Sequence, residues 1–317
     1  MRPRSRWRAW IAAAALGWSG SALAAGGAAQ AQAAEGPRLL GGLLQQTRVV
    51  YPLKVGKWRA VGEQRMQEQA HGVSVRYVHG DAWLDLYIYP GGPMREANLA
   101  RVAQAERGNI GQAAAQGGRD ARLGELQSVH LPGQGDGPPV PAWVLELEYP
   151  GEGLGSAMLL FARNLHLVKA RASAPRQHLQ PGELPREVQA FMGGISRQLR
   201  ITSTGDCWLP RRLRVVDTLP DPQAPQVLAS YSDPEAAPSA VVTLGGIEVA
   251  RAEAGRAEAL ARMMGDALYP GCVAPEEIEP LVPEGWREIR IEYRDTSARR
   301  GRQAPAGRLR ARWRSTG

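Results

Sequence analysis

Hydrophobic and polar residues alternate most regularly between Val73 and Pro90, in the run VSVRYVHGDAWLDLYIYP. An alternation of period two places successive side chains on opposite sides of a pleated strand. The residues His79-Gly80-Asp81 interrupt the run with good turn formers, and Pro90 begins a Pro-Gly-Gly-Pro stop. The pattern predicts two antiparallel strands joined by a tight turn.

The same alternation predicts further strands on either side of this hairpin. They are Thr47–Tyr51, Lys57–Val61, Arg122–Val129, Ala142–Tyr149, Ser156–Arg163 and Leu165–Arg171. Two segments, Pro93–Gln116 and Glu183–Arg200, instead repeat apolar residues at helical spacing. Strands joined by short turns form antiparallel sheets, and amphipathic helices must cover a sheet face. Residues 38–201 are therefore predicted to be an α+β fold, an antiparallel sheet sandwiched by helices.

A short polar linker leads into a second predicted unit, residues 206–295. Its predicted strands are Arg212–Asp217, Gln226–Tyr231, Ala240–Val249 and Trp286–Arg294, and its predicted helix is Arg256–Leu268. This order describes a smaller β-β-β-α-β module. It resembles the order at the start of the first unit, but no repeat is visible at the level of residues, so an internal duplication rests on element order alone.

The chain has two cysteines, Cys207 and Cys272, and both lie in the second unit. In an oxidising compartment such a pair is expected to form a disulfide. Two free buried thiols or a shared metal ion are the alternatives. No histidine stands at metal-ligand spacing from either cysteine, which disfavours the metal.

The first 24 residues have the pattern of a secretory signal peptide. Four arginines precede an apolar run from Ala9 to Leu16, and Ala22-Leu23-Ala24 is a cleavage pattern of small residues. Cleavage after Ala33 and an uncleaved N-terminal anchor are alternatives. Residues 25–37 are rich in Ala, Gly and Gln and predict a disordered lead-in. We therefore expect an exported protein, periplasmic or secreted.

The net charge of +8 is concentrated at the two ends of the chain. The signal segment holds 4 of the 39 basic residues and the tail 296–317 holds 7, which leaves 28 basic against 31 acidic residues between them. The net charge of this central part of the chain is therefore slightly negative, which excludes it as a nucleic-acid-binding surface. The tail itself predicts contact with a polyanion or an anionic membrane surface, or else a solvated end that reflects base composition. The residues for such a contact are Arg308, Arg310, Arg312, Trp313 and Arg314.

Residues Tyr51 to Tyr89 resemble a family of exported proteobacterial proteins whose role is not characterised. The resemblance is carried by VSVRY, by the D-x-Y-x-YP ending at Asp85–Pro90, and by LHLVKARAS at Leu165–Ser173. The order of elements over residues 38–201 is also similar to that of PsbP-like proteins, a family of scaffold and assembly proteins of exported compartments. The resemblance implies a fold and transfers no active site.

The strand after the turn carries Trp83, Asp85, Tyr87 and Tyr89 on one side. One interpretation is an aromatic ligand surface with a single carboxylate. The other is an aromatic face packed beneath a helix, with Asp85 bonded to an arginine or a tyrosine.

Other candidate groups have simpler explanations. His79 and Asp81 suit a base and its orienter, but they also suit a turn. Glu146 and Glu148 share a strand face at about 7 Å, a spacing compatible with a glycosidase pair and with a solvated strand. His166 is interpreted as a hydrogen-bonded core or edge residue. GEGLGS at 151–156 precedes a strand and predicts a hairpin turn.

The sequence predicts no catalytic residue, no metal site and no cofactor. The expected function is a non-catalytic binding or assembly protein of the cell envelope, with an envelope protein or polymer as its partner. An envelope hydrolase whose carboxylates are brought together only by the fold is one alternative. Attachment to a polyanion or membrane surface through the arginine tail is the other.

Overall fold

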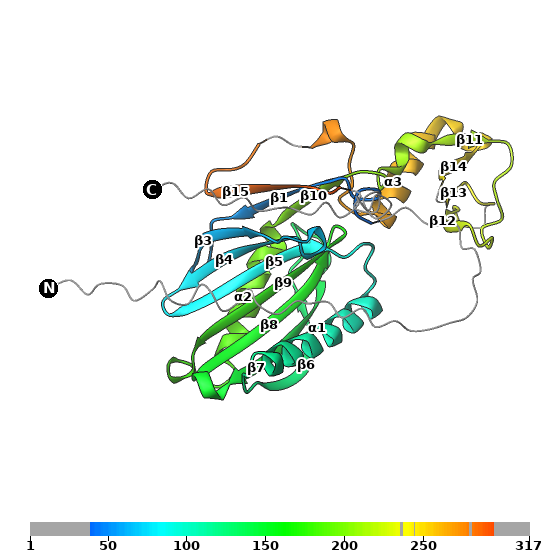
Figure 1. The fold of residues 1–317 in the computed structure, drawn as a ribbon. Helices are drawn as coiled ribbons and strands as arrows, with labels where there is room; N and C mark the ends of the chain where they lie inside the picture. The colour runs from blue at the N-terminus through cyan, green and yellow to red at the C-terminus, as the bar shows by residue number, and fades with distance from the viewer. Residues whose placement is uncertain (1–38, 235–236, 244, 279–280, 295–317) are drawn as a thin grey trace, which may run out of the picture.

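The computed structural model describes residues 39–234, 237–243, 245–278 and 281–294. The predicted signal peptide, the lead-in and the arginine tail with Arg308, Arg310, Arg312, Trp313 and Arg314 lie outside these residues. The described chain forms three sheets and three α-helices (Figure 1). Within it, no helix combines the length and the apolar character needed to cross a bilayer.

The largest sheet has eight strands, and every neighbouring pair in it is antiparallel. In spatial order these are β2 (Lys54–Val55), β3 (Trp58–Arg65), β4 (Val73–His79), β5 (Ala82–Pro90), β9 (His166–Pro175), β8 (Leu154–Arg163), β7 (Val140–Tyr149) and β6 (Arg122–Leu131). The predicted hairpin is β4 and β5, with His79 paired to Ala82 across a two-residue turn.

Two helices pack on opposite faces of this sheet, α1 (Glu96–Gln116) and α2 (Glu183–Gln198) (Figure 1). Alternate residues of β7 and β8 show this division. Leu145, Leu147 and Met158 pack with Ile110 and Ala114 of α1, whereas Val144, Leu159 and Phe161 belong to the core that holds Val188 and Phe191 of α2. The α+β class, with mostly antiparallel strands, is confirmed.

A second sheet joins distant parts of the chain. Its central strand, β1 (Gln46–Pro52), pairs with β10 (Arg200–Thr204) on one side and with β15 (Trp286–Glu292) on the other. The sequence predicted β15 as a strand of the second module, and this placement is wrong. β1 is buried along nearly its whole length, so it needs a partner on both edges, and β15 supplies one.

The remaining sheet lies in the second unit. Its order is β11 (Arg214–Val216), β14 (Gly246–Ala250), β13 (Ala240–Thr243) and β12 (Val227–Tyr231), with β11 and β14 parallel. Helix α3 (Ala257–Leu268) packs against it. The predicted strand Ala240–Val249 is instead a hairpin, in which Thr243 pairs with Gly246 and the chain enters β14 through Gly246 at a φ of 127°, a value that glycine readily adopts.

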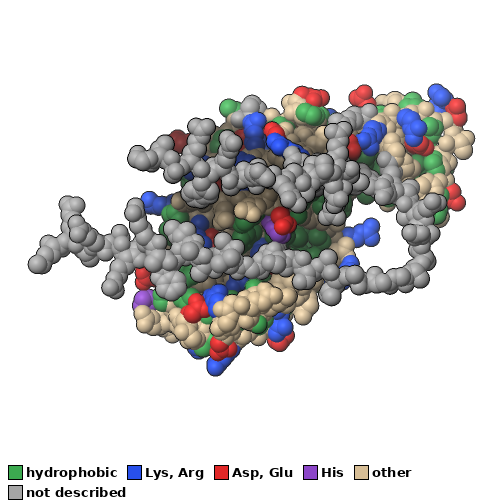
Figure 2. All heavy atoms as spheres, in the orientation of Figure 1, with side chains coloured by type: hydrophobic (Ala, Val, Ile, Leu, Met, Phe, Trp, Pro, Cys, Tyr) green, Lys and Arg blue, Asp and Glu red, His purple; other side chains and the backbone are tan. Residues whose placement is uncertain are grey.

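Short 3-10 helices complete the described elements: η1 (Gln69–His71), η2 (Pro150–Glu152), η3 (Arg176–His178), η4 (Leu209–Arg212), η5 (Arg251–Arg256) and η6 (Pro275–Glu277). Basic and acidic side chains are interspersed over the four-stranded unit (Figure 2). They include the pairs Arg214–Glu248, Arg251–Asp217 and Arg256–Asp233. Exposed pairs of this kind contribute little to the stability of a fold, because water and salt screen them.

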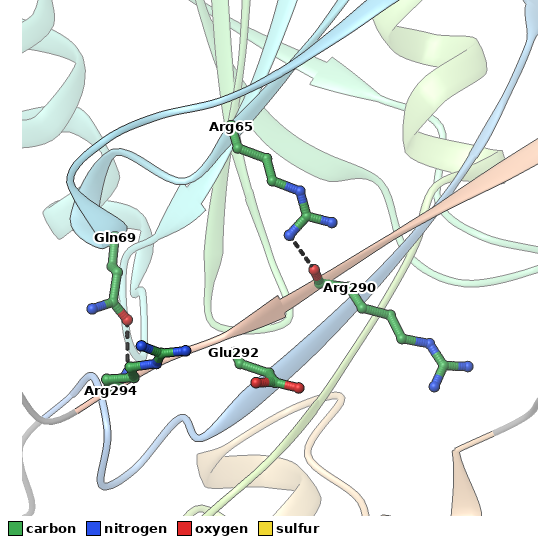
Figure 3. Close-up of a pocket in the computed structure, with 5 residues that line it drawn as sticks. All are labelled: Arg65, Gln69, Arg290, Glu292 and Arg294. Atoms are coloured by element: carbon green, nitrogen blue, oxygen red, sulfur yellow. Dashed lines mark hydrogen bonds between the residues drawn. The ribbon is translucent and has the colours of Figure 1, made fainter.

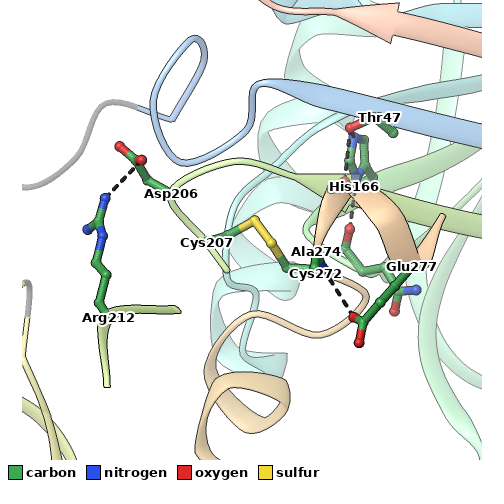
Figure 4. Close-up of a disulfide and its surroundings, with 10 residues drawn as sticks. Thr47, His166, Asp206, Cys207, Arg212, Cys272, Ala274 and Glu277 are labelled. Carbon is green, nitrogen blue, oxygen red and sulfur yellow. Dashed lines mark hydrogen bonds and ion pairs between the residues drawn. A yellow bond between two sulfur atoms is a disulfide. The ribbon is translucent and has the colours of Figure 1, made fainter. Parts of the chain in front are cut away.

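The predicted disulfide joins Cys207 to Cys272, with their Cα atoms 5.9 Å apart (Figure 4). It connects the end of β10 to the segment that follows α3. Beside it, Ser203 donates its backbone N–H to Gly271 at 2.8 Å and accepts that of Val273 at 2.9 Å. The bridge therefore fastens the second unit to the three-stranded sheet.

Replacing both cysteines by serine should destabilise the protein. The bridge closes a loop of 65 residues, for which the chain-entropy model gives a loss of roughly 4 kcal/mol in the free energy of unfolding. Urea unfolding of the Cys207→Ser/Cys272→Ser variant measures this. Wild type in reductant is the matched control and should unfold at the same urea concentration as the variant; wild type that unfolds identically with and without reductant would contradict a structural disulfide.

Candidate ligand surface

Helix α1 covers only part of its side of the eight-stranded sheet. It contacts β6, β7 and β8, and Tyr89 of β5 packs at the edge of that cluster. Trp83 and Tyr87 are half-buried and belong to none of the hydrophobic clusters. We call the region formed by Arg76, Trp83, Asp85, Tyr87 and Arg171 the β5 face, because the pairing of β4, β5 and β9 places these residues on one side of the sheet.

Asp85 is held by Arg76 on the neighbouring strand. Nε of Arg76 donates to Oδ1 at 2.8 Å and Nη2 donates to Oδ2 at 2.7 Å. This two-pronged contact is among the stronger ion pairs in proteins, and it raises the pKa of Arg76. Both carboxylate oxygens of Asp85 are therefore occupied. The arginine keeps 45% of its side chain exposed, and so one surface of the guanidinium remains open.

Beneath α1, the β5 face ends in a buried ion pair. Nζ of Lys169 donates to Glu106 Oε2 at 2.8 Å, and the hydroxyl of Tyr89 donates to Oε1 at 2.8 Å. The ammonium lies 5.2 Å from the ring centre of Tyr87 and 5.5 Å from that of Tyr89. Burial lowers the pKa of Lys169 and raises that of Tyr89. Burial also raises the pKa of Tyr87 to about 12, so both phenols stay neutral.

Arg171 links the exposed and covered parts of the β5 face. It lies directly across from Asp85 in the pairing of β5 and β9. Its Nη2 donates to the hydroxyl of Tyr149 at 3.3 Å, while its buried Nε has no hydrogen-bond partner among the described residues. A buried donor without a partner costs about 1–3 kcal/mol.

The structural interpretation of this strand describes Tyr89 and Asp85, whereas a ligand surface at Trp83 and Tyr87 stays a prediction. Tyr89 packs beneath a helix, and Asp85 is bonded to an arginine, as the structural interpretation expects. Trp83 and Tyr87 lie beyond the helix. The sequence missed Arg76, Glu106, Lys169 and Arg171, although their positions in the alternating strands placed three of them on the same side as the aromatic residues.

The other candidate groups do not form a reaction centre. Asp81 is exposed and lies 3.4 Å from His178 Nδ1, and Glu148 accepts a hydrogen bond from Arg176 at 2.8 Å. Both carboxylates approach η3, but each is paired with a different residue of it. Glu146, on the same strand as Glu148, is exposed. His79 contacts the ring of Trp58 at 6.0 Å between ring centres. Within the described ranges, no group of three metal-binding side chains occurs.

A shallow hollow of about 440 Å³ lies where β3 approaches β15 (Figure 3). Arg65 Nη1 donates to the carbonyl of Arg290 at 2.6 Å, and the backbone N–H of Arg294 donates to Gln69 Oε1 at 2.7 Å. Glu292 contributes a carboxylate to the same hollow. The hydrogen bonds fasten the two sheets together at this point.

A buried network of four polar side chains lies where the two sheets meet, and Figure 4 labels two of them, Thr47 and His166. Thr47 Oγ1 lies 2.9 Å from Ser203 Oγ and 3.3 Å from His166 Nε2, which is 3.4 Å from the hydroxyl of Tyr293. Nδ1 of His166 lies 2.8 Å from the carbonyl of Asn164. The strands β1, β9 and β10 thus meet through hydrogen bonds in an otherwise apolar layer.

This network resembles a hydroxyl–imidazole pair but is closed to substrate. Thr47 is 0% exposed, and His166 and Ser203 are each 1% exposed. Burial lowers the pKa of His166 to about 4, so its ring is neutral at physiological pH. The sequence interpretation of His166 as a hydrogen-bonded core or edge residue agrees with this position. Thr47 carried no sequence signal beyond being a polar residue in a predicted strand, and Ser203 lies in the segment predicted as a polar linker, which is β10 in the structure.

His166 should make stability depend on pH. In the unfolded chain histidine gains its proton below about pH 6.5, whereas folded His166 resists protonation until about pH 4. The free energy of unfolding should therefore fall as pH drops through this window, by roughly 3 kcal/mol from this residue. In urea titrations from pH 7 to pH 4, the stability gap between wild type and His166→Gln should narrow by that amount. The exposed-histidine variant His130→Gln should track wild type, and a constant gap for His166→Gln would contradict the prediction.

The pair Lys169–Glu106 should behave as a buried ion pair. Lys169→Met leaves the Glu106 carboxylate buried without its cation and should lower the free energy of unfolding by about 3–5 kcal/mol. The double variant Lys169→Met/Glu106→Leu should recover most of the loss, because no buried charge is left over. Chemical denaturation of wild type and the two variants measures their free energies of unfolding. A double variant that is less stable than Lys169→Met would contradict the prediction, because it would show that the two groups act independently.

Comparison with known proteins adds a likeness of fold. No protein-family model matches the chain, and no curated protein matches it. The solution structure of cyanobacterial PsbP (CyanoP) from Synechocystis sp. PCC 6803 is similar over 50% of this chain and 94% of that chain, at 13% identity and a TM-score of 0.33. The fold-level resemblance to PsbP-like proteins is thus present and weak, and it assigns no role to any residue.

Proposed function

We propose that the chain is an exported, non-catalytic protein that binds or stabilises a partner in the cell envelope through the β5 face. The signal pattern at the N-terminus and the buried disulfide support export, since disulfides persist in oxidising compartments. That the chain belongs to a family of exported proteobacterial proteins is also part of this proposal. The arginine tail is not needed for it.

The proposal depends chiefly on the chemistry of the β5 face. Tryptophan, tyrosine and arginine are enriched at protein interfaces and dominate their binding energy. Here Trp83 and Tyr87 are half-buried beside the partly exposed Arg76. The neighbouring strands hold the three side chains on a rigid sheet, so binding orders little flexible structure.

Arg76 defines the chemistry of the partner. It has an open guanidinium surface. A carboxylate or carbonyl oxygen of the partner supplies an acceptor for Arg76, while its apolar groups cover the two aromatic rings. We therefore propose a protein partner with an acidic or carbonyl-rich segment.

Site-specific photo-crosslinking in the native envelope tests this function. We expect Trp83→p-benzoylphenylalanine and Tyr87→p-benzoylphenylalanine to give the same discrete adduct on illumination, because both positions face one bound partner. Leu228→p-benzoylphenylalanine is the matched control, since Leu228 is 41% exposed on the four-stranded unit. Immunoblots detect the adducts, and mass spectrometry identifies the crosslinked partner.

Two results would contradict the proposal. One is the absence of an adduct at both β5-face positions, or the same adducts at Leu228. The other concerns location: the chain isolated from the periplasmic fraction should begin after Ala24 or Ala33, and a protein that retains Met1 in the cytoplasm would remove the envelope role.

A further inference from the structure

The outward side of α2 carries a stripe of basic and small residues. Arg186, Ala190, Gly193 and Arg197 recur at intervals of three or four, so they lie along one side of the helix. The opposite side, with Val188, Phe191 and Ile195, is buried in the main core. The two arginines are three turns apart, about 16 Å along the helix axis. Both are exposed.

The end of β6 and the following loop form the facing wall. The hydroxyl of Ser196 donates to the carbonyl of Pro132 at 2.8 Å, and Gln134 Nε2 donates to the carbonyl of Leu199 at 3.0 Å. Gly193 lies directly against this wall, because a Cβ at its position would be in van der Waals contact with Cδ of Pro132, at 3.4 Å. The wall is therefore fixed against α2 by hydrogen bonds and packing.

Between the stripe and the wall lies a hollow of about 450 Å³. This volume is within the range of small-molecule sites, roughly 300–1,000 Å³. Its floor is apolar, formed by Leu131, Pro132, Ala190 and Gly193, and its rim carries Arg186, Arg197, His130 and Gln189. We call it the α2 groove.

The α2 groove carries uncompensated positive charge. None of its lining residues is acidic. The nearby acids of α2 are engaged elsewhere, because Glu187 pairs with Lys57 and Glu183 accepts the backbone N–H of Gln180 at 2.7 Å. Arg197 makes no ion pair or hydrogen bond with another residue of the described chain, and Arg186 makes only a 3.4 Å contact with the carbonyl of Pro181.

We propose that the α2 groove binds a small organic anion, a carboxylate or phosphate attached to a short apolar chain. The anionic group pairs with the guanidinium of Arg186 or Arg197, which suit carboxylate and phosphate geometry. The apolar chain lies on Pro132, Ala190 and Gly193. The groove is on the α2 side of the sheet, opposite the β5 face, so this site is independent of the envelope partner proposed above.

Isothermal titration of the disulfide-bonded protein with hexyl phosphate tests the proposal. Inorganic phosphate and hexanol are the comparison ligands, and dodecyl phosphate distinguishes a short-chain anion from a lipid. We expect hexyl phosphate to bind at least tenfold more tightly than either comparison ligand, because only it uses both an arginine and the apolar floor. Dodecyl phosphate should gain nothing further, because its longer chain extends beyond the groove.

Three variants locate the binding. One of the variants Arg186→Gln and Arg197→Gln, the one that removes the arginine paired with the anion, should weaken hexyl phosphate at least fivefold, and Ala190→Glu should abolish binding by placing a carboxylate on the exposed floor. Arg122→Gln, an exposed arginine on β6 outside the groove, is the matched control and should bind as wild type does. All four positions are on the surface, so circular dichroism should show unchanged folding.

Equal binding of hexyl phosphate and inorganic phosphate would overturn the proposal, as would equal losses in Arg122→Gln and the groove variants. Tighter binding of dodecyl phosphate would assign the groove to a lipid surface instead. Replacing Trp83 by alanine should leave hexyl phosphate binding unchanged. A negative result for anion binding at the α2 groove therefore leaves the proposed partner binding at the β5 face untouched.

Discussion

The pairing of β1 on both of its edges is the constraint on which the rest of the structure depends. β1 is buried from Thr47 to Pro52, so its backbone N–H and C=O groups have no access to water and must be satisfied by neighbouring strands. One neighbour, β10, follows α2, and the other, β15, is the last described strand. The beginning, middle and end of the described chain are therefore held in one ladder, which Figure 1 shows as a blue strand beside an orange one.

The buried polar network and the disulfide act at the same junction. Ser203 takes part in both, through its hydroxyl to Thr47 and through its backbone to Gly271 and Val273. Hydrogen bonds inside a protein specify one arrangement more sharply than apolar contacts do, because each unpaired group is costly. The network thus fixes how the three-stranded sheet sits against β9, while the eight-stranded sheet remains free to carry surfaces on both sides. These are the β5 face on one side and the α2 groove on the other.

The sequence was sufficient to predict features formed by neighbouring residues. It was insufficient to predict contacts between residues that lie far apart along the chain. The alternation at Val73–Pro90 predicted the hairpin, because register within a hairpin is set by neighbouring residues and its turn. The apolar stripe of α2 predicted which side is buried, but not that Arg186 and Arg197 would line a groove, since the facing wall comes from β6. The same limit applied to β15. Its alternation gave a strand, but β1 lies more than 200 residues away and carries no signal of which edge it will accept. Lys169 and Glu106 were similarly separated, on a strand and a helix that only the fold brings together.

The position of β15 also has a consequence for the order in which the protein is made. Synthesis proceeds from the N-terminus, so β1 emerges early and its final partner emerges last. Until residues 286–292 arrive, one edge of a strand that the fold buries is open to pairing with other chains. Nascent or prematurely terminated chains that lack this segment therefore expose a strand edge of the kind that promotes aggregation.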